Sequence, residues 1–453
     1  MPYTPHTADD VKEMLARIGA GAVDDLFRTI PQAARLSKPL DLPPGKTEEE
    51  VRRVMKGLAS RNLSQEDLVS FLGGGVYDSI IPAAVGALSS RSEFLTAYTP
   101  YQPEVSQGTL QVIYEWQTFV CRLTGLDVAN ASMYDGSTAL AEAIRMGTTA
   151  KRRPKVVLPA GLNPRWRRVV ETTLAGEGIA IADAPLGKDG TTEPAALGKA
   201  AAGQGGGEAA GAVVIQNPNY LGLIEPVDAL AEAARAAGAA VIAAVNPVSL
   251  SLLKTPGEYG ADVAVGEAQP LGIPCSFGGP LLGFLACADP LKRLMPGRVV
   301  GRTVDHEGRR GYVLTLQTRE QHIRREKATS NICSNQGLNA LRATIYLAML
   351  GGDGLRELGE ANRVRCEALR AAVRPIKGVT LPFGGPVFNE FVLRLPRPAR
   401  QFRAHARRAG ILAGIPLAGF AGCGEGDLLV AVTEKRTAAE IDLYARTLKD
   451  FVK

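Results

Sequence analysis

The stretch that best predicts the fold of this chain is Ala261–Gly283, which reads ADVAVGEAQPLGIPCSFGGPLLG. A short apolar run is followed by a polar turn, a loop rich in glycine and proline, and a second apolar run beginning near Leu281. Short, nearly continuous apolar runs bounded by turn residues are typical of strands buried on both faces. The stretch therefore predicts strand, loop and strand in a covered sheet. It has no lysine, since none occurs between Lys254 and Lys292.

The same pattern extends along the chain, where apolar runs alternate with segments of helical period such as Pro164–Ala175 and Val227–Ala237. Strands alternating with helices form a mostly parallel sheet with helices on both faces. We therefore expect a large three-layer α/β domain over residues 70–334. The predicted strands are Lys155–Pro159, Gly178–Asp183, Gly211–Gln216, Ala239–Val245, Asp262–Val265 and Gly283–Ala286.

Residues 1–69 predict an N-terminal helical arm. Helix starts of the capping-box type occur at Thr7-x-x-Asp10, Thr47-x-x-Glu50 and Ser64-x-x-Asp67, with a proline-rich connector after the first. The arm has no apolar core of its own, so we expect it to pack on another subunit or domain.

Residues 335–453 predict a linking helix followed by a small C-terminal α+β domain. The helix covers Asn335–Val373, with a break at Gly351–Gly352. The strands VFNEFVLRL and DLLVAVT follow it, and Thr437-x-x-Glu440 opens the last helix.

Composition excludes several classes of protein. The chain has 453 residues, of which 45% are hydrophobic and 22% charged, as in a folded protein with a large core. Its apolar runs are too short to cross a bilayer and no secretory signal is seen, so we expect a cytoplasmic protein without membrane contact. The net charge of +6 is modest and the basic clusters lack a recognition motif, so nucleic-acid binding is not expected. Those clusters suit an acidic protein partner better.

Cysteine and histidine spacing argues against a metal site. None of the six cysteines forms a CxxC pair, and none of the four histidines lies in ligand spacing with a cysteine. We therefore expect no metal and reduced thiols.

Several long motifs occur along the chain. They are FLGGGVYD at Phe71–Asp78, TAYTPYQPEVSQG at Thr96–Gly108, ASMYDGSTA at Ala131–Ala139, QNPNYLGLIE at Gln216–Glu225 and KATSNIC at Lys327–Cys333. Together they resemble the glycine decarboxylase P-protein family of the glycine cleavage system, whose architecture is that of fold-type I enzymes dependent on pyridoxal 5'-phosphate (PLP). The resemblance covers nearly the whole chain, and at this length it is to subunit 1, the N-terminal half of a divided P-protein.

The resemblance implies a partner and a reaction. Subunit 2 would carry the PLP, and no cofactor is expected on this chain. The two chains would form a heterotetramer of two plus two that decarboxylates glycine. The aminomethyl group would then pass to the lipoyl arm of the H-protein.

The residues themselves also argue that cofactor anchors are missing. A fold-type I site needs a lysine for the Schiff base, an acid beneath the pyridine nitrogen and a phosphate cradle at a helix N-terminus. Gln269 and Pro270 stand in the lysine slot, so this chain supplies no catalytic residue. No carboxylate occurs from Ala239 to Leu253. Lys254 lies too early and Lys327 too late to replace the lysine.

One group of candidate residues would be remnants of the cofactor pocket. The turn before a predicted helix at Ala139–Met146 retains a cradle-like sequence, and QNPNY follows the carboxyl end of a strand. Both segments have an alternative explanation as a helix cap and an Asn-Pro turn. The candidates are Asp135, Gly136, Ser137, Thr138, Asn217 and Asn219.

The loop Tyr98–Glu104 is the strongest functional candidate. Two tyrosines, an amide and a carboxylate lie among prolines that restrict the backbone, and rigid polar loops are common functional sites. The resemblance places this region near the active site, so it would shape the partner's pocket or the lipoyl channel; alternatively, its tyrosines only pack at the subunit interface. The candidates are Tyr98, Tyr101, Gln102, Glu104 and Ser106.

Two other functions compete with that of a P-protein subunit. The chain could be an autonomous PLP-dependent decarboxylase or lyase, which would bind its own cofactor. It could also be a purely structural scaffold that does not reach the active site.

Overall fold

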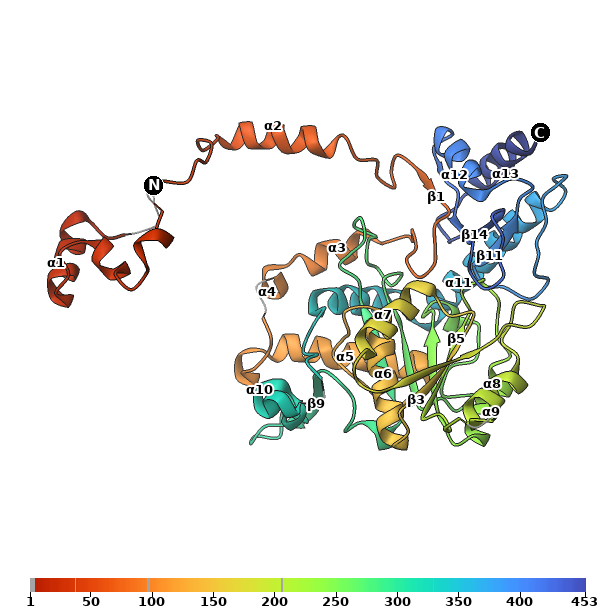
Figure 1. Ribbon diagram of the computed structural model, residues 1–453, viewed down its shortest axis with the longest axis horizontal. Helices are drawn as coiled ribbons and strands as arrows, with labels where there is room; N and C mark the ends of the chain where they lie inside the picture. The colour runs from red at the N-terminus through yellow and green to blue at the C-terminus, as the bar shows by residue number, and fades with distance from the viewer. Residues whose placement is uncertain (1–4, 37, 96–97, 205–206, 329) are drawn as a thin grey trace. The chain divides into compact units, whose positions relative to one another are not determined.

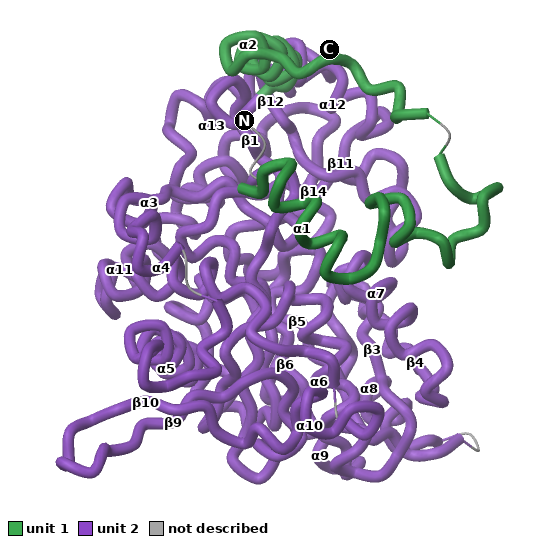
Figure 2. The backbone as a smooth tube through the Cα atoms, turned by 90° about the vertical axis from the view of Figure 1, so that its left-hand side faces the viewer, with its two compact units in different colours: residues 1–63 green, residues 64–453 purple. Residues whose placement is uncertain are grey.

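The computed structural model describes residues 5–36, 38–95, 98–204, 207–328 and 330–453. The chain forms two compact units, Met1–Leu63 and Ser64–Lys453 (Figure 2). In the first unit, Thr7 caps α1 (Ala8–Ile18) and Thr47 caps α2 (Glu48–Ala59), as the capping boxes predicted. Neither helix contains a buried residue. Short 3-10 turns lie at Val23–Phe27 and Gln32–Ala34.

A seven-stranded sheet forms the centre of the second unit (Figure 1). Its strand order is β2-β8-β7-β6-β5-β3-β4, in which β8 runs antiparallel to both of its neighbours, β2 and β7, and every other pair is parallel. The mostly parallel sheet is therefore confirmed, and the predicted strands match β3 to β8 with small shifts at their ends. The strands are β2 (Val128–Ala129), β3 (Lys155–Pro159), β4 (Ala180–Ala184), β5 (Ala212–Asn217), β6 (Ala240–Val245), β7 (Val263–Glu267) and β8 (Gly283–Cys287).

Helices cover both faces of this sheet (Figure 1). Successive strand residues face opposite layers, so Val156 and Leu158 pack against α6 and α7 while Val157 belongs to the core formed with the other helices. The first layer contains α6 (Gly136–Lys151) and α7 (Pro164–Leu174), and the second contains α5 (Gln107–Thr124), α8 (Pro194–Ala202), α9 (Val227–Ala236) and the start of α11 (Gly337–Val373).

The C-terminal part has its own core. Helix α11 is interrupted at Gly351, whose φ of 62° is the left-handed conformation that glycine tolerates, so the predicted break is confirmed. A three-stranded sheet packs against helices around a separate hydrophobic cluster. Its elements are β11 (Glu390–Arg394), α12 (Ala399–Arg408), β13 (Ile415–Pro416), β14 (Asp427–Ala431) and α13 (Ala438–Val452).

Shorter elements connect these layers. A β-hairpin, β9–β10, projects from the second unit (Figure 2). The short strand β1 pairs in parallel with β12 and so joins the start of this unit to the C-terminal part. The bounds are β1 (Val69–Ser70), α3 (Ala83–Ser89), α4 (Ser92–Leu95), η3 (Pro103–Val105), η4 (Ser249–Ser251), η5 (Asp289–Leu291), β9 (Val299–Val304), β10 (Arg310–Thr315), η6 (Gln317–Arg319), α10 (Gln321–Arg324), η7 (Arg325–Lys327) and β12 (Ile411–Leu412).

The helix predicted at Ser64-x-x-Asp67 does not form, and that prediction is wrong. The Asp67 carboxylate accepts hydrogen bonds from both the backbone N–H and the hydroxyl of Ser64, at 2.7 and 2.8 Å. The segment makes only a turn before β1, because its side chains satisfy the backbone locally and the next residues, Val69–Ser70, pair with β12 instead of continuing a helix.

Among the described residues, none of the helices combines the length and apolar character that a bilayer crossing requires. Three or more metal-ligating side chains of His, Cys, Asp or Glu do not gather anywhere in that part of the chain.

Candidate functional site

The lysine slot lies in the loop that connects β7 to β8, and Gln269 is buried there. Its side-chain carbonyl accepts a hydrogen bond from Tyr77 N at 2.8 Å. Its amide nitrogen donates to Tyr77 O at 3.0 Å and to Ile273 O at 2.7 Å. Pro270 is also buried. Gln269 therefore joins its loop to the FLGGGVYD motif, and both its amide nitrogen and its carbonyl oxygen have partners within the protein.

The cradle-like turn is satisfied by protein side chains as well. Asp135 caps α6, since its carboxylate accepts from Thr138 N at 2.7 Å and from the Ser137 hydroxyl at 2.8 Å. Glu267 Oε2 accepts from Gly136 N at 3.1 Å. The positive N-terminus of α6 thus faces two carboxylates of the chain itself.

Glu267 lies at the end of β7 and is buried. Its second oxygen accepts from the backbone N–H groups of Gln269 and Leu282, both at 3.0 Å. Burial raises the pKa of Glu267 to about 7, while these N–H groups and that of Gly136 oppose the shift. This side chain therefore bridges the α6 terminus and both ends of the β7–β8 loop.

Trp166 closes the space in front of this terminus. A Cβ built on Gly136 would lie 2.3 Å from the indole ring, so only glycine fits there. The remaining cavity has a volume of about 40 Å³ and is lined by Tyr77, Trp166, Glu267 and Glu390 among others. That volume is far below the range of about 300–1,000 Å³ that is usual for small-molecule sites.

A second buried acid, Glu390 of β11, faces the same cavity. Its oxygens accept from Gly74 N at 2.7 Å and from the Tyr77 hydroxyl at 2.8 Å. Burial raises the pKa of both Glu390 and Tyr77. The C-terminal sheet thus binds the FLGGGVYD motif at Gly74 and Tyr77, in addition to Gln269 of the lysine-slot loop.

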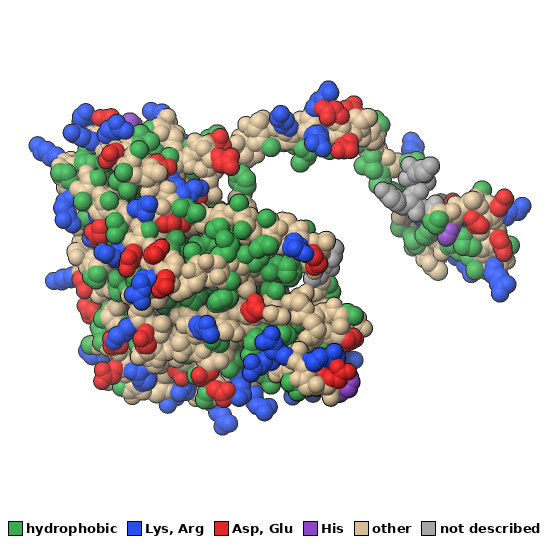
Figure 3. All heavy atoms as spheres, turned by 180° about the vertical axis from the view of Figure 1, so that it is seen from behind, with side chains coloured by type: hydrophobic (Ala, Val, Ile, Leu, Met, Phe, Trp, Pro, Cys, Tyr) green, Lys and Arg blue, Asp and Glu red, His purple; other side chains and the backbone are tan. Residues whose placement is uncertain are grey.

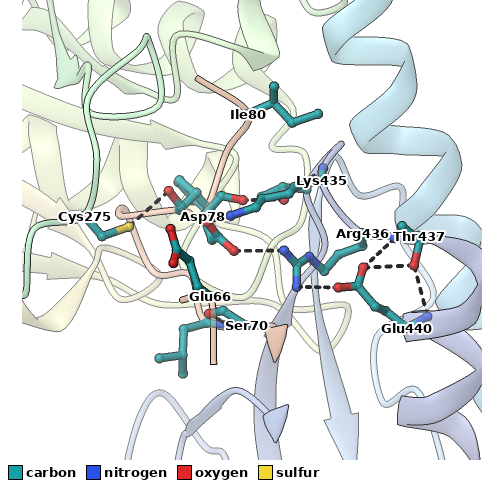
Figure 4. Close-up of polar contacts among 12 residues, drawn as sticks. Glu66, Ser70, Asp78, Ile80, Cys275, Lys435, Arg436, Thr437 and Glu440 are labelled. Carbon is teal, nitrogen blue, oxygen red and sulfur yellow. Dashed lines mark hydrogen bonds and ion pairs between the residues drawn. The ribbon is translucent and has the colours of Figure 1, made fainter. Parts of the chain in front are cut away.

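Asp78, at the end of that motif, is fixed by two cations of the C-terminal part (Figure 4). Its carboxylate lies 2.7 Å from Lys435 Nζ and 2.8 Å from a guanidinium nitrogen of Arg436. Both Asp78 and Arg436 are buried, and Cys275 Sγ lies 3.3 Å from the neighbouring Tyr77 O. The motif is therefore a structural junction between the lysine-slot loop and the C-terminal sheet.

The two asparagines of QNPNY hold their own turn. Asn219 Oδ1 accepts from Leu221 N and Leu223 N, and Asn217 Oδ1 accepts from Glu225 N. Both are buried, and neither lines the small cavity, although Gln216 and Pro218 do. The geometry matches the alternative of an Asn-stabilised turn.

Neither lysine near the slot enters the cavity. Lys254 Nζ lies 2.7 Å from the carboxylate of Asp228 in an exposed pair. Lys327 is exposed and lines a different, basic pocket beside Arg319.

The side chains of the loop Tyr98–Ser106 are mostly exposed to solvent, whereas those around the lysine slot are buried. The side chains of Tyr98 and Tyr101 are 83% and 51% exposed, and Gln102 and Glu104 are also exposed. Ser106 is half-buried at the start of α5, but its hydroxyl does not cap that helix. The structure thus brings these candidates together on one surface; Thr96 and Ala97 of the same motif lie outside the described residues.

Comparison with known proteins agrees with the motifs. The family model for the glycine cleavage system P-protein matches residues 1–448. The chain is 48% identical over 449 residues to the probable glycine dehydrogenase (decarboxylating) subunit 1 of Chlorobium phaeobacteroides, with 99% of each chain covered. The chain belongs to the P-protein family. A similar relative from Geobacillus kaustophilus is 47% identical over 448 residues, covering 99% of this chain and 98% of its own.

Solved structures support both the P-protein assignment and the fold. An inhibitor-bound glycine decarboxylase (P-protein) of the glycine cleavage system is similar with a TM-score of 0.91 and 44% identity, covering 99% of this chain and 100% of its own. The sphingosine-1-phosphate lyase of Burkholderia pseudomallei is 16% identical with a TM-score of 0.64, covering 93% of this chain and 94% of its own, and shows the fold alone. The fold-type I PLP-transferase architecture expected from the sequence is confirmed.

The residues of this P-protein chain do not fit PLP at the position the fold offers. Gln269 replaces the lysine, β6 ends without an acid, and Glu267 and Asp135 already take the α6 N-terminus. The sequence pointed to the first two features but not to Glu267, Tyr77, Glu390 or Trp166. A carboxylate at the end of an otherwise apolar strand was the one available signal for Glu267.

Proposed function

We propose that this chain is the cofactor-free subunit of a two-chain glycine decarboxylase. The observation that carries the proposal is the slot in which Gln269 and Glu267 bind the loop and helix that a cofactor would otherwise contact. Relatives named as subunit 1, at nearly full coverage, support a divided enzyme. A subunit 2 with the Schiff-base lysine then binds the PLP.

The exposed apolar surface supports such a partner. Hydrophobic side chains gather across the face of the second unit shown in Figure 3. A pocket of about 440 Å³ is lined mainly by apolar groups, among them Leu95, Tyr98, Tyr134 and Leu338, which are each at least 40% exposed. Exposed apolar patches of this kind mark protein interfaces. We propose that subunit 2 covers this face and that two such pairs form a heterotetramer.

The reaction of the complex is the decarboxylation of glycine, followed by transfer of the aminomethyl group to the lipoyl arm of the H-protein. This chain contributes the loop Tyr98–Ser106, whose exposed tyrosines and Glu104 complete the partner's pocket or line the path of the lipoyl arm. Its basic clusters attract an acidic carrier. The complex belongs in the cytoplasm, since the six cysteines are free thiols and suit a reducing compartment.

Co-purification tests the complex. The tagged chain should retain a lysine-bearing homologue of similar length, and the pair, but neither chain alone, should release CO2 from glycine in the presence of lipoylated H-protein. Failure of the two chains to associate contradicts the proposal.

Absorbance tests the division of labour. The purified chain alone should show no visible band after incubation with PLP, whereas the partner should show one that borohydride removes. A borohydride-sensitive band on this chain would instead favour an autonomous enzyme.

Kinetics separate a contributing subunit from a scaffold. Tyr101→Phe and Glu104→Gln should lower turnover of the assembled complex without changing its assembly. Unchanged turnover in both variants would favour the scaffold.

A further inference from the structure

The ring of Tyr101 packs on a buried cation, the guanidinium group of Arg298. The guanidinium carbon of Arg298 is 4.5 Å from the centre of the Tyr101 ring. The His322 ring meets the same tyrosine edge-on, with centroids 6.0 Å apart and an interplanar angle of 79°. Half of the Tyr101 side chain remains exposed above this support.

Arg298 is itself held by a buried acid. Its Nε lies 2.9 Å from Glu320 Oε2, and the two side chains are only 2% and 5% exposed. A second guanidinium nitrogen lies 3.4 Å from the Ser334 hydroxyl, which is 2.9 Å from that of Thr99 in the loop. The pair therefore supports the loop at both Thr99 and Tyr101.

Regular structure fixes the backbone of both members of the pair. Arg298 immediately precedes β9, and its carbonyl accepts from Ala131 N at 2.8 Å. Glu320 precedes α10, and its carbonyl accepts from Arg324 N at 2.9 Å. A rigid base thus carries a loop that has little regular structure of its own.

Burying Arg298 and Glu320 removes two charges from water, and this desolvation costs free energy that their mutual attraction must offset. A buried ion pair is often no more stabilising than apolar residues of the same volume. An arginine nevertheless offers a planar face on which an aromatic ring can stack while its edge binds a carboxylate, and lysine cannot do both. The arrangement suits orientation of Tyr101 better than it suits stability.

We propose that Arg298 and Glu320 are positioning residues, which set the orientation in which Tyr101 is presented to the active site of the assembled enzyme. This inference rests on the proposed function, since it gives the loop a role in turnover. It assigns that role to two residues that do not belong to the loop.

The test is a double-mutant cycle in the assembled complex. Arg298→Lys keeps the buried charge but loses the planar face, and should lower kcat/KM by about tenfold, as a small misplacement of a positioned group does. In a Tyr101→Ala background the same change should have less than about a twofold effect, because contacting residues that act as one unit are not additive. Equal losses in both backgrounds would show that Arg298 acts independently of Tyr101 and would overturn the inference.

Arg394→Lys provides a control at a second arginine that binds a buried acid. Arg394 binds the buried Asp427 at 2.7 and 2.9 Å in the C-terminal sheet. Its replacement should leave kcat/KM unchanged in the assembled complex.

A second measurement does not depend on turnover. Chymotrypsin cleavage after Tyr98 or Tyr101 in the isolated chain should become several-fold faster in Arg298→Lys and Glu320→Gln, but not in Arg394→Lys. Unchanged cleavage would overturn the positioning role. Faster cleavage combined with full activity of Tyr101→Ala would instead contradict the proposed function of the loop and retain the positioning contact.

Discussion

The remnant of the cofactor pocket and the loop Tyr98–Ser106 belong to the same compact unit but treat their polar groups in opposite ways. In the pocket, Gln269 and Glu267 are buried and bind backbone groups of distant segments. In the loop, Gln102 and Glu104 are exposed. Buried polar groups with complete hydrogen bonding contribute to structure, whereas exposed ones on a supported loop are free to meet a partner. The buried polar groups of the pocket therefore belong to the framework of the fold, whereas the exposed groups of the loop are the ones for which we propose a role in the complex.

The largest effect on stability should come from Asp78, whose carboxylate joins the end of the FLGGGVYD motif to Lys435 and Arg436 of the C-terminal part. Asp78→Ala leaves the buried Arg436 without this partner and should lower the free energy of unfolding by about 3–5 kcal/mol. Chemical denaturation measures it. Asp228→Ala, which removes the acid from the exposed pair with Lys254, is the control and should cost less than about 1 kcal/mol. Similar losses in the two variants would remove the distinction between a structural pocket and an ordinary surface.

Introducing a lysine at position 269 tests whether the pocket can form a Schiff base with PLP. Gln269→Lys loses the bonds to Tyr77 and Ile273, so the free energy of unfolding should fall by about 1–3 kcal/mol. Incubation with PLP should still give no visible band that borohydride removes, because the acid of β6 is also missing. A stoichiometric band would contradict the conclusion that the pocket is now structural.

Glu267→Gln tests the structural role of the pocket through the pH dependence of the free energy of unfolding. The pKa of Glu267 in the folded chain is about 7, above its ordinary value of 4.5. The native state therefore binds more protons than the unfolded chain between these values, and the wild-type free energy of unfolding falls as pH rises through this window. The glutamine variant lacks this contribution. It should be less stable by about 1 kcal/mol at pH 4.5, where its amide meets the Gly136 N–H, and the difference should narrow toward pH 7. A difference in the free energy of unfolding that stays constant between pH 4.5 and pH 7 would contradict the assignment of this pKa.

The smallest effect on stability should come from the loop itself. Glu104→Gln changes an exposed group and should alter the free energy of unfolding by less than about 0.5 kcal/mol, yet lower turnover of the complex about tenfold. Glu208→Gln, on an exposed turn before β5, is the control that should change neither quantity. A Glu104 variant that loses stability but not turnover would reverse the comparison.

Much of the fold could be predicted from sequence because its signals are local. The strands from β3 to β8 are short apolar runs, and Thr7, Thr47 and Thr437 cap their helices through residues three positions away. Ser64 gave the same signal without a helix, because the residues after Asp67 pair with the distant strand β12.

The filling of the pocket could not be predicted, because it depends on residues far apart in the chain. Glu267 meets Gly136 across 131 positions, and Gln269 meets Tyr77 across 192. The contact of Arg298 with Tyr101 is equally remote from any local pattern. The empty lysine slot was visible in the sequence, but its replacement by an internal network was not.

Trp166 adds a steric obstacle to the absence of cofactor anchors. Its indole ring leaves no room for any side chain at Gly136, and it stands where a returning ligand would have to approach the helix. A chain with a lysine at position 269 would still hold the tryptophan, the two carboxylates at the α6 terminus and a β6 strand without an acid. Several coupled substitutions, each within a buried network, would therefore be needed before this chain could take over the cofactor role that we propose for its partner.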